Sequence, residues 1–171
     1  MANALDVRPE DLAEVSRQLG RPARDVLAIA ARCACGAPTV VATRPRLADG
    51  TPFPTFYYLT HPAATAAASR LEASGRMAQY QALLEGETLE RYRAAHAAYL
   101  RDRDAHGRVP EIEGVSAGGM PERVKCLHAL IAHALAAGPG VNPIGDLALA
   151  ESGWSPEVCE CAPRSTAGGE P

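Results

Sequence analysis

The first part of the chain carries apolar residues at helical spacing. In "RPEDLAEVSRQLGRP", Leu12, Val15 and Leu19 recur at steps of three and four residues, which places them on one face of a helix. Pro9 and two acidic residues stand at the beginning of this stretch, and Gly20 follows it, as is typical of helix ends. The pattern predicts a short amphipathic helix.

Between residues 26 and 60 the pattern changes to short segments rich in β-branched and aromatic residues. The segments are "VLAIAARC", "PTVVATRP" and "PTFYYLT", and they are separated by "ACGA" and by a connection rich in proline and glycine. Such segments, bounded by turn residues, predict a small antiparallel sheet of about three strands. Taken alone, "VLAIAARC" fits a helix equally well, because a short apolar run has no decisive periodicity.

From residue 61 onwards the spacing is helical. An alanine-rich helix is expected to begin at His61 and to end at Gly75, and a second helix is expected from Glu87 to about Ala105. One face of the second helix carries Leu89, Tyr92, His96, Tyr99 and Arg103.

A glycine-rich loop, "VSAGGMPERV", precedes a further predicted helix. Pro121 suits the first turn of this helix, and Gly138 and Pro139 suit its end. Residues 156–171 are expected to form a disordered tail. The chain of 171 residues is long enough for one compact core. We therefore predict a single α+β domain over residues 1–155, with the small sheet packed against a mostly helical C-terminal half.

Composition narrows the class of protein. Hydrophobic residues make up 47% of the chain and charged residues 22%, which is typical of a globular protein. The net charge of -3 provides no basic field for a phosphate backbone, so nucleic acid is not an expected partner. No apolar run of about 18 residues occurs, and the first residues do not resemble a signal peptide. We therefore expect a cytoplasmic protein without membrane insertion.

The five cysteines are the most distinctive chemical feature, namely Cys33, Cys35, Cys126, Cys159 and Cys161. An odd number of cysteines in a reducing compartment favours thiols over a disulfide framework. Two C-x-C pairs, at residues 33–35 and 159–161, have the same spacing, and thiolates are preferred ligands of zinc. The local pattern therefore allows a metal site built from both pairs, and it equally allows small, partly buried thiols without a metal.

The stretch "PERVKCLHALIAH" adds one cysteine and two histidines. In a regular helix the backbones of Cys126 and His133 would lie about 10 Å apart along the axis, too far to share one zinc ion. In the same helix the side chains of Cys126 and His128 would point to nearly opposite sides. We therefore expect this helix to supply one ligand, with the others coming from elsewhere.

Two longer blocks, "RCACGAPTVVATRPRLADGTPFPTFYYLTHP" and "SAGGMPERVKCLHALIAHALAAGPGVNPIGD", resemble the bacterial family catalogued as domain of unknown function 501. The likeness extends from about residue 10 to residue 150. The family has no established activity, so the resemblance implies motifs and not a reaction. Its pattern has a cysteine matching Cys33, a cysteine or histidine matching His61, and a Lys-Cys-Leu-His run matching residues 125–128. Residues 132–133 and 142–143 also match it.

The resemblance implies a particular ligand set. Position 35 varies among the relatives and the tail cysteines are peripheral, which favours Cys33, His61 and Cys126 over the two C-x-C pairs. Exchange of cysteine for histidine is what a soft-metal site tolerates, so zinc is the first expected cofactor and an iron–sulfur cluster is the alternative. The expected metal ligands are therefore Cys33, His61, Cys126 and His133, with His128 as an alternative to His133.

The sequence also fits two other functions. One is that of an interaction or scaffold protein whose cysteines are only core residues. The other is that of a small enzyme that uses Cys126 or His96 on an anionic substrate. Arg123 and Lys125, beside the glycine-rich loop and a helix N-terminus, are the expected anion-binding residues, with Arg103 as a further anchor. A partner would then be an anionic small molecule or another protein.

Overall fold

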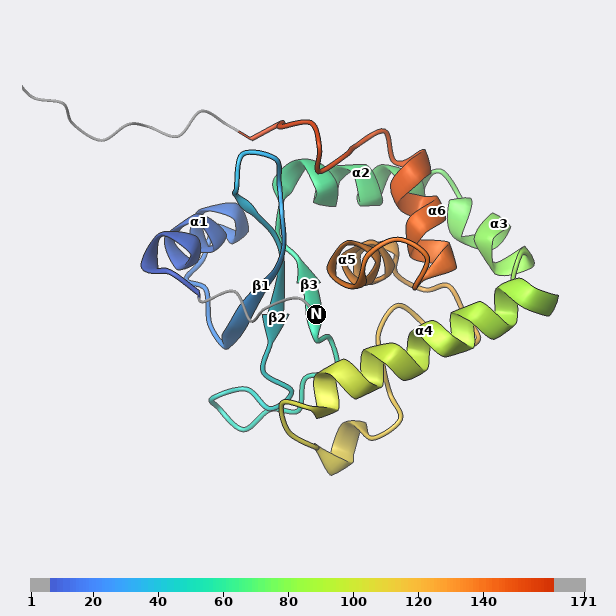
Figure 1. Ribbon diagram of the computed structural model, residues 1–171, viewed down its shortest axis with the longest axis horizontal. Helices are drawn as coiled ribbons and strands as arrows, with labels where there is room; N and C mark the ends of the chain where they lie inside the picture. The colour runs from blue at the N-terminus through green and yellow to red at the C-terminus, as the bar shows by residue number, and fades with distance from the viewer. Residues whose placement is uncertain (1–6, 162–171) are drawn as a thin grey trace, which may run out of the picture.

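The computed structural model describes residues 7–161, and residues 1–6 and 162–171 lie outside the described part (Figure 1). The described elements are α1 (Pro9–Leu19), β1 (Val26–Arg32), β2 (Pro38–Thr43), β3 (Tyr57–Leu59), α2 (Pro62–Ala73), α3 (Arg76–Ala82), α4 (Gly86–Asp104), a 3-10 helix (Pro110–Ile112), α5 (Leu127–Ala137) and α6 (Pro143–Glu151). One antiparallel sheet in the order β1-β2-β3 and helices on both of its faces make this an α+β fold, as predicted.

Strand β2 lies in the middle of the sheet and separates two apolar clusters. Ile29 of β1 pairs with Val41, and Leu59 of β3 pairs with Val40. Neighbouring residues of a strand point to opposite faces. Val41 therefore packs with Ile29 and with Val15 of α1, whereas Val40 belongs to the larger core formed by the helices. Residues 26–32 are thus a strand and not a helix.

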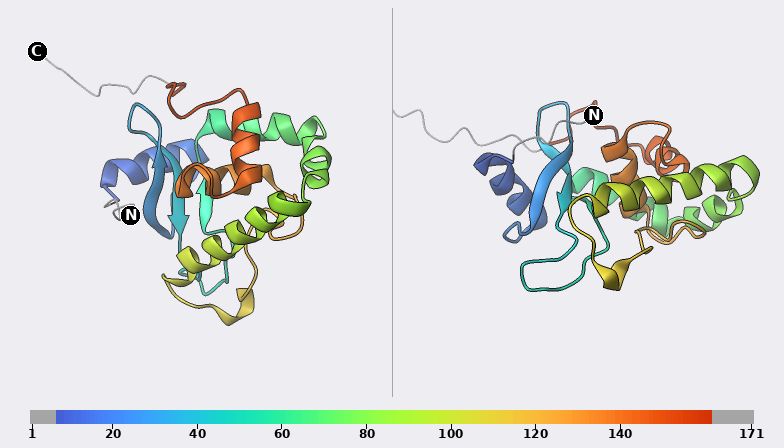
Figure 2. Two further views of the ribbon diagram at one scale, coloured as in Figure 1. Left: turned by 45° about the vertical axis from the view of Figure 1, so that its right-hand side comes forward. Right: turned by 60° about the horizontal axis from the view of Figure 1, so that its bottom comes forward.

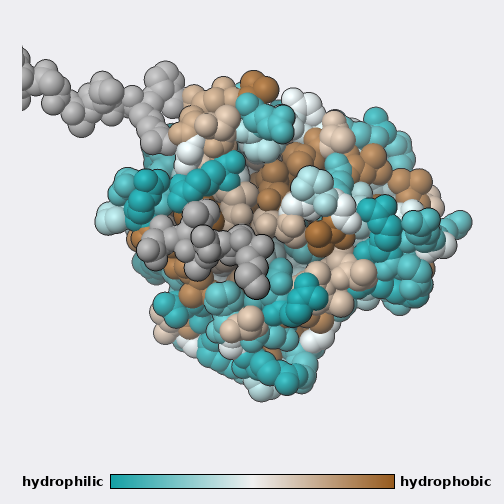
Figure 3. All heavy atoms as spheres, viewed as in Figure 1, coloured by the Kyte–Doolittle hydropathy of each residue, from teal (hydrophilic) through white to brown (hydrophobic). Residues whose placement is uncertain are grey.

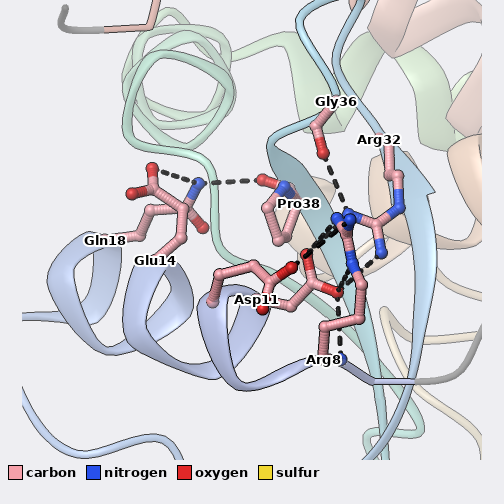
Figure 4. A network of polar contacts seen from close by, with 8 residues as sticks. Arg8, Asp11, Glu14, Gln18, Arg32, Gly36 and Pro38 are labelled. Atoms are coloured by element: carbon pink, nitrogen blue, oxygen red, sulfur yellow. Dashed lines mark hydrogen bonds and ion pairs between the residues drawn. The ribbon is translucent and has the colours of Figure 1, made fainter. Parts of the chain in front are cut away.

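Helix α1 covers one face of the sheet and is held there by a buried ion pair (Figure 4). The carboxylate of Asp11 is 3% exposed and accepts hydrogen bonds from Arg32 at 2.7 and 2.9 Å. Arg32 and Arg8 hold the pKa of Asp11 well below its usual range. Arg32 also donates to the carbonyl of Gly36 at 2.9 Å, so the pair fixes the turn between β1 and β2.

Helix α5 occupies the centre of the other face, where it packs against β3, α2 and α6 (Figures 1 and 2). Helix α4 matches the predicted second helix and is joined to its neighbours by tyrosines. The hydroxyl of Tyr99 accepts from the backbone N–H of Phe56 at 2.6 Å, and the hydroxyl of Tyr92 donates to the carbonyl of Arg123 at 2.8 Å. These contacts connect the helical half to both the sheet and the loop before α5.

The start of α5 differs from the prediction. The helix begins at Leu127 and not at Pro121, because the glycine-rich loop first folds back on itself. Gly118 and Gly119 have φ angles of 71° and 95°, which favour glycine, and their carbonyls accept from the backbone N–H groups of Lys125 and Arg123. Cys126 is therefore the residue before the helix, which removes the helical geometry assumed for its side chain.

The C-terminal segment after α6 returns to the sheet. Trp154 is buried, and the carbonyl of Pro156 accepts from the backbone N–H of Ala34 in the β1–β2 turn at 2.8 Å. The tail predicted for residues 156–171 thus begins with six residues that are described, 156–161, while residues 162–171 lie outside the described part. Figure 2 shows this segment passing above the sheet towards the β1–β2 turn.

The surface is mixed in character (Figure 3). In that view hydrophilic residues cover α1 and the outer end of α4, and hydrophobic residues gather towards α6. Within residues 7–161, no helix combines the length and the apolar character needed to span a bilayer.

Candidate metal centre

The turn between β1 and β2 positions the first C-x-C pair. Cys33 directly follows β1, its N–H donates to the carbonyl of Ala37 at 2.8 Å, and its carbonyl accepts from the N–H of Gly36 at 2.8 Å. Gly36 has a φ of 86°, a conformation that favours glycine and that lets the chain reverse here. The tight turn holds Cys33 in the core and leaves Cys35 exposed.

The C-terminal segment brings the second pair to the same place. The sulfur atoms of Cys33, Cys35, Cys159 and Cys161 all lie within 4.8 Å of one another. The Sγ atoms of Cys35 and Cys161 are 3.4 Å apart. Four thiolates around one zinc ion, with bonds of about 2.3 Å, would lie about 3.8 Å apart in a regular tetrahedron. The observed spacing therefore suits a single tetrahedral ion.

The thiols of the cluster differ in pKa. The backbone N–H of Ala37 lowers the pKa of Cys35 to about 7. Burial raises the pKa of Cys33 and that of Cys161. The five cysteines of the chain all lie within residues 7–161, and none of them forms a disulfide there. A cation bound by the cluster would replace the protons of these thiols.

His61 lies beside the cluster and not in its centre. It is 2% exposed, it precedes α2, and its Nε2 atom is 3.1 Å from the Sγ of Cys161. Its ring also contacts Trp154, with ring centroids 5.3 Å apart. A ring N–H at this distance donates a hydrogen bond to a thiolate and stabilises its charge, as neighbours of metal ligands commonly do.

Cys126 belongs to a second, separate cluster. Ligand atoms of Glu72, Cys126 and His128 lie within 4.8 Å of one another. Cys126 and then Glu72 raise the pKa of His128 to about 9, and His128 lowers the pKa of Cys126. Cys126 and His128 therefore meet on one side of the chain, contrary to the expectation that they would point apart.

Comparison with known proteins assigns the chain to a family. The family described as Protein of unknown function (DUF501) matches residues 29–150. The chain belongs to this family. No curated protein and no solved structure matches the chain. The family match includes the turn with Cys33 and Cys35 and all of the second cluster, whereas Cys159 and Cys161 follow it in the sequence.

The four ligands expected from the family pattern are not brought together. Cys33 lies in the four-cysteine cluster with His61 beside it, and Cys126 lies at the start of α5. His133 is fully buried in the helical core, where its ring stacks on Tyr57 with centroids 5.7 Å apart. The four residues thus lie in three different environments.

The residues considered for an enzyme site also differ in their surroundings. His96 is half-buried, with Nδ1 2.8 Å from the hydroxyl of Ser116, and burial lowers its pKa. Arg103 is 1% exposed and donates to the carbonyls of Val115 and Ile112, so its charge holds a loop in place. Arg123 and Lys125 are exposed on the loop before α5.

The four-cysteine cluster could be anticipated in part from the sequence. The repeated C-x-C spacing indicated a thiolate site, and the family pattern led to another ligand set. No spacing along the chain could show that the segment after α6 returns to the β1–β2 turn. Glu72 carried no sequence signal for its role, because its partners Leu127 and His128 are 55 and 56 positions away in the sequence.

Proposed function

We propose that the protein binds one zinc ion through Cys33, Cys35, Cys159 and Cys161. The observation that carries this proposal is the convergence of four sulfur atoms, from two distant segments, within 4.8 Å of one another. A tetrahedral soft metal ion requires such an arrangement of sulfur atoms. His61 would support the ion from outside by its hydrogen bond to Cys161.

The ion would have a structural role. Four protein ligands fill the coordination sphere of zinc, which leaves no open position for a substrate. The ligands come from the β1–β2 turn and from the C-terminal segment, so the ion would fasten this segment to the sheet. A reducing compartment such as the cytoplasm suits the site, because zinc requires reduced thiolates.

Zinc fits the spacing better than an iron–sulfur cluster. The four thiolates that hold a cluster are divided among at least two iron atoms, so some of them lie further apart than thiolates around one ion. A single tetrahedral ion accounts for sulfur atoms that are all within 4.8 Å. The iron–sulfur cluster remains the alternative that the experiment must distinguish.

The test is metal analysis of protein purified under reducing conditions without a metal-affinity tag. We expect zinc and no visible colour in the wild type, and loss of this zinc in Cys35→Ser and in Cys159→Ser. Both cysteines are exposed, so both variants should retain the near-UV circular dichroism of the folded core. The matched control is Cys126→Ser, which should keep the zinc of the four-cysteine site.

Two results would contradict the proposal. Zinc content that is unchanged in both Cys35→Ser and Cys159→Ser would show that the ion is held elsewhere. Brown protein with iron and labile sulfide that both substitutions abolish would assign the same cysteines to a cluster instead of zinc.

A further inference from the structure

The end of α2 and the start of α5 meet at Glu72. Its carboxylate accepts from the backbone N–H of Leu127 at 2.8 Å and lies 3.0 Å from the Nδ1 atom of His128. The first contact satisfies one of the N–H groups that every helix start leaves without an intrahelical partner. Glu72 therefore fixes the start of α5 and the position of the His128 ring together.

The thiol of Cys126 completes this group. One ligand atom from each of Glu72, Cys126 and His128 lies within 4.8 Å of the other two. The donor types are oxygen, sulfur and nitrogen, all of which zinc accepts. The Nε2 atom of His128 is 3.1 Å from the hydroxyl of Ser69, so the ring is held from its outer side as well.

We propose that Glu72, Cys126 and His128 form a second metal site, which takes a divalent transition-metal ion, zinc first, and leaves one coordination position open. Three protein ligands leave the fourth position of a tetrahedral ion to water or another small ligand. The site is accessible, since the side chains of Glu72 and His128 are 25% and 28% exposed.

The fourth ligand would be water, hydroxide or a small anion. Arg123 and Lys125 are exposed on the loop that leads directly to Cys126, and the family match includes the whole site. A small carboxylate or phosphate bound to the ion would also be attracted by these two cations. The open position also makes this site different from the closed four-cysteine site, where all ligands come from the protein.

The alternative for the same residues is an ion pair without a metal. In that case Glu72 caps α5, and a protonated His128 pairs with Glu72 and with the Cys126 thiol. The two arrangements make different predictions, because a metal ion needs Cys126 and His128 deprotonated and competes with their protons. Metal affinity should therefore increase as the pH is raised from 6 to 8, and an ion pair alone should bind no zinc at any pH.

The experiment uses the full chain with the first site removed. In the Cys35→Ser/Cys159→Ser background, zinc is titrated against a fluorescent chelator, and the titration is repeated after adding Cys126→Ser or His128→Gln. Serine is a favourable residue before a helix, so Cys126→Ser should not disturb the start of α5. His106→Gln, at an exposed histidine on another part of the surface, is the matched control.

We expect the background protein and its His106→Gln variant to bind one zinc ion per chain. Each ligand substitution should weaken zinc binding by at least about 100-fold, since even loss of an outer hydrogen bond to a metal ligand costs 10- to 100-fold. No zinc binding in the background protein, or binding that neither ligand substitution changes, would overturn the second site. The four-cysteine proposal is judged separately, by the zinc that the wild type holds beyond the background.

Discussion

At the scale of single residues, His133 shows how burial alone can set the properties of an ionisable group. Its ring stacks on Tyr57, meets the edge of the Tyr99 ring with centroids 5.1 Å apart, and is fully buried. The amide of Asn142 donates to its Nδ1 atom at 3.1 Å, which fixes the neutral ring. Burial lowers the pKa of His133 to about 4.

This histidine should make stability depend on pH in a defined window. The unfolded chain takes up a proton at His133 below its ordinary pKa of about 6.5, whereas the folded protein does so only near pH 4. The free energy of unfolding should therefore fall as the pH is lowered from about 6.5 towards 4, by up to about 3 kcal/mol from this group.

Urea unfolding at several pH values in that window tests the prediction. In His133→Gln the decrease should be smaller than in the wild type by the contribution of His133, because all other groups are the same in both proteins. The two proteins must be compared in the same metal-loaded state. Parallel pH profiles for the two would show that another group carries the dependence.

The residue types predicted the kind of site better than they predicted which residues meet in the fold. The two C-x-C pairs suggested a soft metal, and the structure does bring them together. Cys35 and Cys161 are 126 positions apart, so their contact depends on the path of the whole chain. Cys126 and His128 were misjudged for a local reason, because Cys126 precedes α5 and does not follow helical geometry.

At the scale of elements, the Asp11–Arg32 pair determines how α1 is joined to the sheet. The pair links α1 to the end of β1, and Arg32 also holds the carbonyl of Gly36 in the turn that carries Cys35. Without Arg32 the buried carboxylate would keep only its contacts with Arg8, at 3.2 and 3.3 Å. Its charge would then be less well compensated, which costs more than the ion pair itself contributes.

Arg32→Met should therefore lower the free energy of unfolding by about 2 to 3 kcal/mol, measured by urea unfolding at neutral pH. The control is Arg44→Met, whose side chain is 58% exposed and lies 3.9 Å from Asp25. That surface contact should contribute less than about 1 kcal/mol. Equal effects of the two substitutions would mean that the Asp11–Arg32 pair has no special role.

Helices α1 and α4 were predictable from their periodicity, and the three strands from their β-branched and aromatic residues between turns. The start of α5 was not, because Gly118 and Gly119 fold the loop back and Glu72 caps the helix from another element. Helix α6 was not predicted from the sequence, and it contains Gly145. A Cβ atom there would lie 2.2 Å from the carbonyl oxygen of Leu130, so this glycine permits close packing of α5 and α6.

At the scale of the whole molecule, the chain brings its C-terminal segment back to its first hairpin. Residues 156–161 follow the region that matches the family, and they reach the β1–β2 turn by the hydrogen bond between Ala34 and Pro156 and by the two cysteines. A zinc ion at this contact would connect the beginning of the sheet with the end of the described chain. Sulfur ligation is therefore the central feature of the proposed site.

X-ray absorption at the zinc edge tests sulfur ligation most directly. The sample is the Cys126→Ser variant loaded with one zinc ion per chain, so that the second proposed site does not contribute. The account predicts a shell of four sulfur atoms at about 2.3 Å from zinc. A first shell dominated by nitrogen or oxygen at about 2.0 to 2.1 Å would contradict the four-cysteine site.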